Sequence, residues 1–195
     1  MSFRSLILFI TLFSLAIQHG RAQIELDNAS FEGTPQDATL PQGWFGCEMG
    51  TTPDIMPGIW GVIMEPSDGD SYIGLITRED GSYESIGQRL PEAMEKDLCY
   101  SFSLDLARSK TYAGYNFPIK LRIYAGSKKC QTKQLLWSSP TISHEEWETY
   151  KVEFTAKKNF NYIIIEAYFG DGLLFKYNGN VLLDAMTPLV PCIRA

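Results

Sequence analysis

The nine residues Cys99-Tyr100-Ser101-Phe102-Ser103-Leu104-Asp105-Leu106-Ala107 alternate between apolar and polar side chains. Tyrosine, phenylalanine and leucine take every second position, with serine or aspartate between them. Successive side chains of a β-strand point to opposite faces, so this spacing predicts a strand with one face in a core and the other toward water. Such half-buried strands are typical of antiparallel sheets.

Similar patterns recur along most of the chain. Residues 119–123 and 150–154 alternate in the same way, whereas 162–169 and 181–183 are more continuously apolar, as central strands are. Residues 59–64, 71–77 and 83–90 complete the predicted strands, and 91–96 is predicted as a short helix. Turn residues such as Asn178-Gly179 separate these segments. About ten short strands predict one all-β domain, a two-sheet antiparallel β-sandwich of the jelly-roll kind.

The segment Asn28-Ala29-Ser30-Phe31-Glu32 is predicted as a short first strand, and Trp44 as the start of the next one. Phe31 and Trp44 are the expected apolar anchors of this opening. The triplet that begins at Asn28 also has the form of an N-glycosylation site. Because Phe31 must be buried nearby, we favour a structural role in which Asn28 bonds to the backbone.

Residues 1–22 are predicted to form a secretory signal peptide, with cleavage between Ala22 and Gln23. Arg4 supplies the charged start, and 6–17 is an apolar run that falls short of the about 20 residues that span a bilayer. Residues 23–195 then form a single exported domain, which is secreted, periplasmic or held at the cell surface.

The predicted mature chain is acidic. Without Arg4 and Arg21, 15 basic residues face 23 acidic ones, a net charge of −8. Nucleic acids and anionic membranes attract clustered lysine and arginine, so neither is an expected partner. A glycan or an envelope protein is the expected partner instead.

Four cysteines, Cys47, Cys99, Cys130 and Cys192, are an even number, which in an exported chain favours two disulfides. Three pairings are possible. We favour Cys99–Cys130 together with Cys47–Cys192, because the second bridge would tie the beginning of the domain to its end. A zinc site is not expected, since no Cys-x-x-Cys is present and the mature chain has one histidine, His144.

Two predicted loops, 108–117 and 169–180, are rich in aromatic and amide side chains, the combination that a sugar site needs. Rings cover the apolar faces of a pyranose, while amides and arginine bond its hydroxyls. Trp60 and Trp137 are further candidates, and the alternative is that these rings cap the core. The predicted ligand-binding residues are Arg108, Tyr112, Tyr115, Asn116, Tyr177 and Asn178.

Two catalytic interpretations are weaker. Gly69-Asp70-Ser71 resembles the nucleophile segment of a serine esterase, but the residue three before His144 is Thr141 rather than an acid, so we interpret it as a turn. Glu146 and Glu148 could share a strand face as the two carboxylates of a glycoside hydrolase or lyase. A solvated start of a strand explains them more simply.

The opening segment with Trp44, the run Gly69-Asp70-Ser71-Tyr72-Ile73-Gly74-Leu75 and the run Val181-Leu182-Leu183-Asp184 together resemble the galactose-binding-like jelly rolls, which include many carbohydrate-binding modules. The runs 52–55, 99–107 and 177–181 look like a group of secreted, envelope-associated bacterial proteins that are sometimes fused to OmpA-like or gliding-motility modules. The resemblance covers nearly all of the predicted mature chain.

The resemblance also implies a structural calcium ion between the first and last strands, held by oxygen ligands. Glu32 and Asp184 are the first candidates for its ligands, and Asn28 and Asp70 the next. Asp184 interrupts an apolar strand, where an unpaired carboxylate would be costly.

Taken together, these patterns predict a secreted, non-catalytic binding module that recognises a carbohydrate or an envelope component through its aromatic loops. The first alternative is a structural or protein-interaction domain of the envelope without a sugar site. The second is the glycoside hydrolase or lyase.

Overall fold

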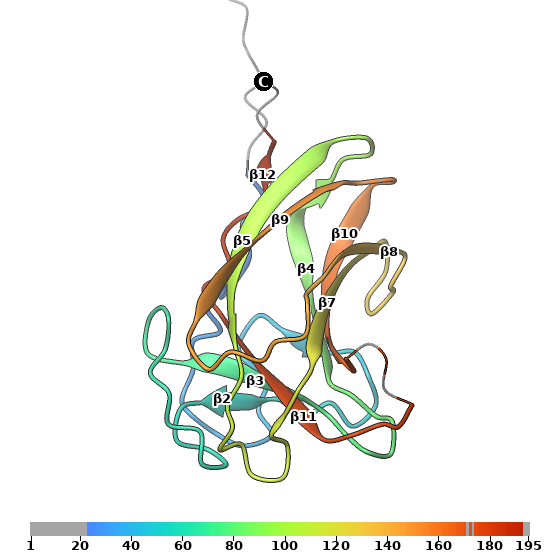
Figure 1. Ribbon diagram of the computed structural model, residues 1–195. Helices are drawn as coiled ribbons and strands as arrows, with labels where there is room; N and C mark the ends of the chain where they lie inside the picture. Colours follow the sequence, from blue (N-terminus) through green and yellow to red (C-terminus); the bar gives the residue numbers. More distant parts are fainter. Residues whose placement is uncertain (1–22, 171, 173, 193–195) are drawn as a thin grey trace, which may run out of the picture.

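The computed structural model of the chain describes residues 23–170, 172 and 174–192, so the predicted signal peptide lies outside the described residues. Two sheets face each other (Figure 1) and form the predicted all-β sandwich. The five-stranded sheet has the order β1-β4-β10-β7-β8, and its strands are Phe45–Gly46, Ser85–Met94, Phe160–Tyr168, Lys120–Gly126 and Gln134–Ser138. Its neighbours in this order all pair antiparallel.

The seven-stranded sheet has the order β12-β5-β11-β3-β2, with β9 paired to β5 and β6 to β11. The main path comprises Val190–Pro191, Cys99–Ala107, Gly179–Asp184, Tyr72–Thr77 and Asp54–Met56, and the added strands are Glu148–Thr155 and Phe117–Pro118. The β6–β11 contact is a short parallel pairing.

The period-two strands are confirmed. β5 has the predicted bounds, and its residues Tyr100, Phe102, Leu104 and Leu106 are buried in the core between the sheets. The central strands β10 and β11 are buried along most of their length, as their continuous apolar sequence indicates.

Three predicted elements are wrong. Residues 28–30 form turns and 31–32 have no regular structure, because Asn28 and Phe31 have φ values of 49° and 54°, which a strand does not allow. Residues 59–64 also turn, with Trp60 at a φ of 51° between two left-handed glycines. The predicted helix at 91–96 is the end of β4, where a register irregularity against β10 accommodates Pro91.

The two predicted anchors hold the opening turns in place. Phe31 is fully buried, and its ring lies 5.0 Å from that of Trp44, which is 6% exposed. The indole N–H of Trp44 donates to the carbonyl of Asn28 at 3.1 Å. The Asn28 amide donates to two backbone carbonyls and accepts from the N–H of Glu32, so its side chain serves the turn.

A second, smaller core covers part of the outer face of the seven-stranded sheet. Tyr72, Ile76 and Leu182 lie on the side of their strands that faces away from the main core, and the loops that contain Val62 and Tyr112 bury them. These loops therefore cover this part of the outer sheet face.

Two disulfides are present, as predicted, but the favoured pairing is wrong. Cys47 is joined to Cys130, and Cys99 to Cys192. Cys99 begins β5, which pairs with the β12 segment just before Cys192, so the sheet itself brings these two together. Disulfides persist in oxidising compartments, in agreement with an exported chain. In the part of the chain that the structure describes, no helix has the length and apolar character needed to cross a membrane.

Candidate functional site

The outer face of the five-stranded sheet is defined by the alternation along β10. Ile163, Ile165 and Ala167 point into the core, so the residues between them point outward. Glu166 is one of these outward residues, and in the sheet register it lies opposite Ser85 of β4 and Arg122 of β7. Three adjacent strands thus present a serine, a carboxylate and a guanidinium in one row.

Each residue of this row has a polar atom without a hydrogen-bond partner among the residues that the structure describes. Ser85 Oγ and Arg122 Nε are buried without a hydrogen-bond partner. Glu166 is 7% exposed, and its carboxylate has no hydrogen bond or ion pair with the residues that the structure describes. Buried polar groups are normally hydrogen-bonded, so three such groups together indicate a place where a polar ligand or water completes the bonding.

Tyrosine rings flank the row. Tyr168 follows Glu166 on the same face of β10, and its ring meets that of Tyr83 edge to face at 6.0 Å. The guanidinium carbon of Arg122 lies 3.2 Å from the centroid of the Tyr168 ring. Each of these rings is half-buried and leaves part of its surface accessible. We call this region the sheet-face site, and its residues are Tyr83, Ser85, Arg122, Glu166 and Tyr168.

Phe45 and the Cys47–Cys130 disulfide border one side of the sheet-face site. Gly87 follows Ser85 by two residues and faces the same way, and a Cβ there would lie 2.8 Å from the Phe45 ring and 3.1 Å from Cys47 Sγ. The Cys47–Cys130 bridge therefore packs over the sheet at this point. Phe45 also contacts the Tyr162 ring at 6.3 Å, so the polar row has an apolar border.

Burial also sets the charge of the site. It raises the pKa of Glu166 to about 7; Arg122 opposes this rise, and the nearby negative charge of Glu48 adds to it. Burial raises the pKa of Tyr83 to about 12, with a further contribution from Glu166. Glu166 is thus near its protonation midpoint at neutral pH. It can accept hydrogen bonds from hydroxyl groups when ionised and donate one to them when protonated.

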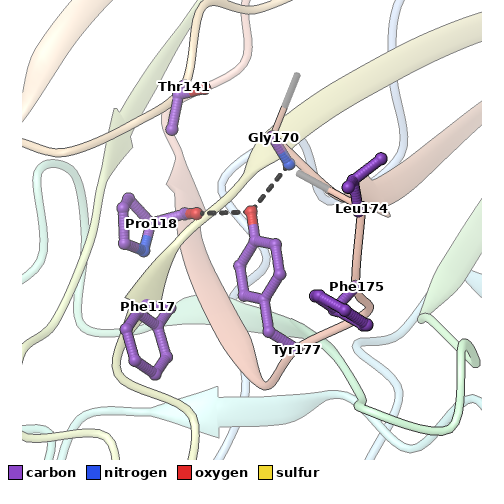
Figure 2. A pocket seen from close by; sticks show the side chains of 7 residues that line it. All are labelled: Phe117, Pro118, Thr141, Gly170, Leu174, Phe175 and Tyr177. Atoms are coloured by element: carbon purple, nitrogen blue, oxygen red, sulfur yellow. Dashed lines mark hydrogen bonds between the residues drawn. The ribbon is translucent and has the colours of Figure 1, made fainter. Parts of the chain in front are cut away.

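A second hollow lies between β6 and the segment that joins β10 to β11. Phe117 and Tyr177 meet edge to face at 5.9 Å there. Figure 2 shows the Tyr177 ring between Phe117 on one side and Leu174 and Phe175 on the other. The volume is about 410 Å³. We call this hollow the end pocket, and its lining residues are Phe117, Pro118, Thr141, Gly170, Leu174, Phe175 and Tyr177.

Four of the six predicted ligand-binding residues are spread over three hollows, and Asn116 and Asn178 line none of these. Arg108 lines one of about 220 Å³ with Lys110 and Glu145, Tyr112 and Tyr115 line another of about 100 Å³, and Tyr177 lines the end pocket. The two aromatic loops do meet, but through Phe117 and Tyr177. The assignment of these residues to a ligand stays a prediction.

Several of these side chains have structural partners. The Arg108 guanidinium donates to the carbonyl of Asn116 at 2.6 Å, and the Asn178 side-chain oxygen accepts from the N–H of Glu79 at 2.8 Å. The Tyr177 hydroxyl donates to the carbonyl of Pro118 and accepts from the backbone N–H of Gly170.

The hollow of about 100 Å³ contains a buried carboxyl. Tyr112, 2% exposed, donates its hydroxyl to Asp54, and burial raises the pKa of Asp54 to about 6 despite this bond. Trp60, one of the two further tryptophan candidates, is 47% exposed at the rim and donates its indole N–H to Asp37. Trp137 lies elsewhere, against the ring of Tyr150.

The predicted calcium ligands bond to other protein groups. Asp184 accepts from the Ser30 hydroxyl and from three backbone N–H groups, those of Ser67, Asp68 and Ala185. Glu32 accepts from the N–H of Asp70 and the hydroxyl of Ser71. Asn28 serves the opening turn. Because N–H and O–H donors already use the Asp184 and Glu32 oxygens, this donor set does not fit calcium well, and the calcium site stays a prediction.

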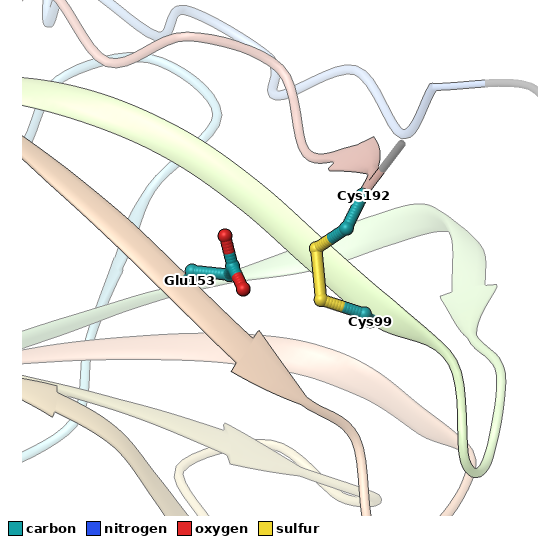
Figure 3. Close-up of side chains that lie close together, drawn as sticks. All are labelled: Cys99, Glu153 and Cys192. Carbon is teal, nitrogen blue, oxygen red and sulfur yellow. A yellow bond between two sulfur atoms is a disulfide. The ribbon is translucent and has the colours of Figure 1, made fainter. Parts of the chain in front are cut away.

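Figure 3 shows the Glu153 carboxylate directed at the Cys99–Cys192 bridge. Among the described residues this is the one group of three possible metal ligands whose ligand atoms lie within 4.8 Å of one another. Both sulfurs belong to the disulfide, so they are not thiolate ligands, and the group is not a metal site in this state.

The residues of the two catalytic interpretations have local structural roles. Ser71, the residue before β3, is fully buried, and its hydroxyl bonds to the Glu32 carboxylate and to the carbonyl of Phe31. His144 bonds to the Tyr150 hydroxyl and to the carbonyl of Glu146, and Glu148 lies exposed at the first residue of β9.

No protein-family model matches the chain, and no curated protein matches it. Solved structures share its fold. The xylan-binding CBM22-1 domain of Paenibacillus barcinonensis Xyn10C gives a TM-score of 0.53 at 13% identity, over 86% of this chain and 94% of that one. The K2 cleaved adhesin domain of Lys-gingipain also gives 0.53, at 9% identity, over 85% and 97%.

An arabinose-bound α-L-arabinofuranosidase, MgGH51, gives a TM-score of 0.61 at 12% identity over 87% of this chain. The match covers 26% of the enzyme, so this chain spans about a quarter of its length. At these identities the likeness concerns the fold. The predicted resemblance to carbohydrate-binding jelly rolls is therefore confirmed for the architecture, whereas the link to gliding-motility proteins stays a prediction.

Proposed function

We propose that the chain is a secreted, non-catalytic module that binds a glycan across the sheet-face site. The observation that carries the proposal is the row of Ser85, Glu166 and Arg122, in which Ser85 Oγ, Arg122 Nε and the Glu166 carboxylate have no hydrogen-bond partner among the described residues. The sandwich shared with carbohydrate-binding modules supports it as well.

Each residue type has a defined task in this proposal. Glu166 bonds sugar hydroxyls, and Arg122 donates to ring or hydroxyl oxygens. Tyr83 and Tyr168 offer ring surface to the apolar face of a pyranose.

The test is a glycan array of plant, algal and bacterial polysaccharides, followed by calorimetry of each glycan that binds. The wild-type chain is expected to bind at least one glycan, and Tyr168→Ala to weaken that binding about tenfold or more through lost ring contact. Glu153→Gln on the opposite sheet is the matched control. Absence of binding across the whole panel would refute the proposal.

Hydrolysis is tested in the same samples by the release of new reducing ends. A hydrolase needs two carboxylates on either side of the scissile bond, and the sheet row contains one, Glu166. No release is expected. If cleavage occurs and disappears in Glu146→Gln or Glu148→Gln, the hydrolase alternative replaces the proposal.

A protein-interaction domain of the envelope is the second candidate. Leu174 and Phe175 are 94% and 83% exposed, an unusual display of apolar side chains for a protein without a partner. A single stoichiometric partner recovered from envelope extract, together with a negative glycan array, would favour this function.

A further inference from the structure

The end pocket differs in chemistry from the sheet-face site. Its surface is almost wholly apolar, and three of its large side chains face solvent: Phe117 is 58% exposed, Leu174 94% and Phe175 83%. A volume of about 410 Å³ lies in the range of pockets that hold small molecules. Solvent exposure of this much apolar surface is unfavourable unless something covers it.

The polar groups in the end pocket already bond to one another. The Tyr177 hydroxyl donates to Pro118 at 2.9 Å and accepts from Gly170 at 2.7 Å. A sugar ring needs several free hydrogen-bonding groups around its hydroxyls, and the end pocket offers few. Its chemistry suits an apolar group instead.

A chain of ring contacts connects the end pocket to the sheet-face site. Tyr168, the last residue of β10, contacts Phe169 at 5.9 Å, Phe169 contacts Tyr177 at 5.7 Å, and Tyr177 contacts Phe117 at 5.9 Å. Lys176 Nζ lies 4.1 Å from the centroid of the Phe169 ring and 5.8 Å from that of Tyr168, at the border between the two regions. A ligand on the sheet face therefore has the end pocket as its neighbour.

We propose that the end pocket binds an acyl or aryl group carried by the glycan on the sheet-face site. The apolar group covers Phe117 and Phe175, and Lys176 at the border donates to the oxygen that links this group to the sugar. The inference rests on the proposed function, which supplies the glycan part of the ligand. It narrows the ligand class from glycans in general to glycans with an apolar substituent.

The test compares matched glycosides by calorimetry: the 4-methylumbelliferyl and methyl glycosides of xylobiose, cellobiose, mannobiose and galactobiose. With one of these sugars, the aryl glycoside is expected to bind at least about tenfold more tightly, which requires about 60 Å² of buried apolar surface. Phe175→Ser should reduce the advantage to less than about twofold and leave the methyl glycoside unaffected. Ile63→Ser, which removes another exposed apolar side chain, is the control and should keep the advantage.

The outcomes separate the two proposals. Equal affinity for the aryl and methyl glycosides would overturn the apolar subsite and leave glycan binding intact. Binding of free 4-methylumbelliferone with no binding of any methyl glycoside would overturn the glycan part, and this inference with it. A dimer in sedimentation that Phe175→Ser abolishes would show that a second copy covers the pocket, which would also overturn the inference.

Discussion

The substitution Glu166→Gln tests whether the buried glutamate of the sheet-face site lowers the free energy of unfolding when it ionises. Burial raises the pKa of Glu166 from 4.5 to about 7, so the ionised form is disfavoured in the folded protein. The pKa of this carboxyl is higher in the folded protein than in the unfolded chain. Its contribution to stability is therefore fully present at pH values below the pKa of the unfolded state, and it is lost as the pH rises through 7. The shift corresponds to at most about 3 kcal/mol, which water at the carboxylate reduces to about 1–2 kcal/mol.

The assay is urea unfolding of the wild type and of Glu166→Gln at pH 5 and pH 8. The wild type should lose stability between these pH values, and the variant should lose about 1–2 kcal/mol less, because glutamine does not ionise. Glu84 is also buried with a pKa raised to about 7, so part of the loss remains in the variant. Glu153→Gln, at an exposed position on β9, should behave like the wild type.

If Glu166→Gln and the wild type lose the same stability between pH 5 and pH 8, the carboxyl ionises freely in the folded protein. The account of an unpaired, buried glutamate would then be refuted. Greater loss in the variant than in the wild type would contradict it even more strongly, because the sign would be reversed.

Three further predictions concern the fold. Trp44→Ala should lower the free energy of unfolding by about 3–5 kcal/mol, measured by urea denaturation, because it empties the contact with Phe31; a loss below about 1 kcal/mol would refute the anchor role. In the double variant Cys47→Ser, Cys130→Ser the free energy of unfolding should fall by about 2–4 kcal/mol. Glycan binding should also weaken, because the disulfide borders the sheet-face site. Unchanged binding would show that the site does not need the disulfide. A calcium ion between the first and last strands predicts a lower melting temperature in chelator, and identical curves with and without chelator would remove the calcium prediction.

Much of the fold could be predicted from periodicity. The alternation in 99–107 identifies β5 to the residue, because one side of that strand meets the core and the other meets water. The opening segment was less predictable. Phe31 was identified as an anchor, but the left-handed backbone at Asn28 and Phe31 depends on bonds to residues more than ten positions away, such as Trp44.

The cysteine pairing shows a limit of a different kind. Four cysteines allow three pairings, and the choice depends on which strands are neighbours. The pairing of β12 with β5 decides it, and β12 consists of two residues that carry no strand pattern. Knowledge of sheet order was needed before any bridge could be assigned.

The aromatic loops were predicted to form the ligand site, which stays a prediction, and the sheet-face site was missed. A signal for it existed: Glu166 interrupts the continuous apolar run of β10. Asp184 interrupts an apolar strand in the same way, but it has four hydrogen bonds within the protein, whereas Glu166 has none among the described residues. Sequence marks both carboxylates as unusual, and the structure distinguishes the satisfied one from the unsatisfied one.

The most direct test of the proposed function is to map where a bound glycan lies. Backbone amide shifts in NMR spectra are recorded while the glycan that binds most tightly in the array is titrated into the labelled chain. The account predicts the largest changes at Ser85, Arg122 and Glu166, on three neighbouring strands. Changes confined to the loops around Tyr112 and Tyr115, with none on the sheet face, would contradict it.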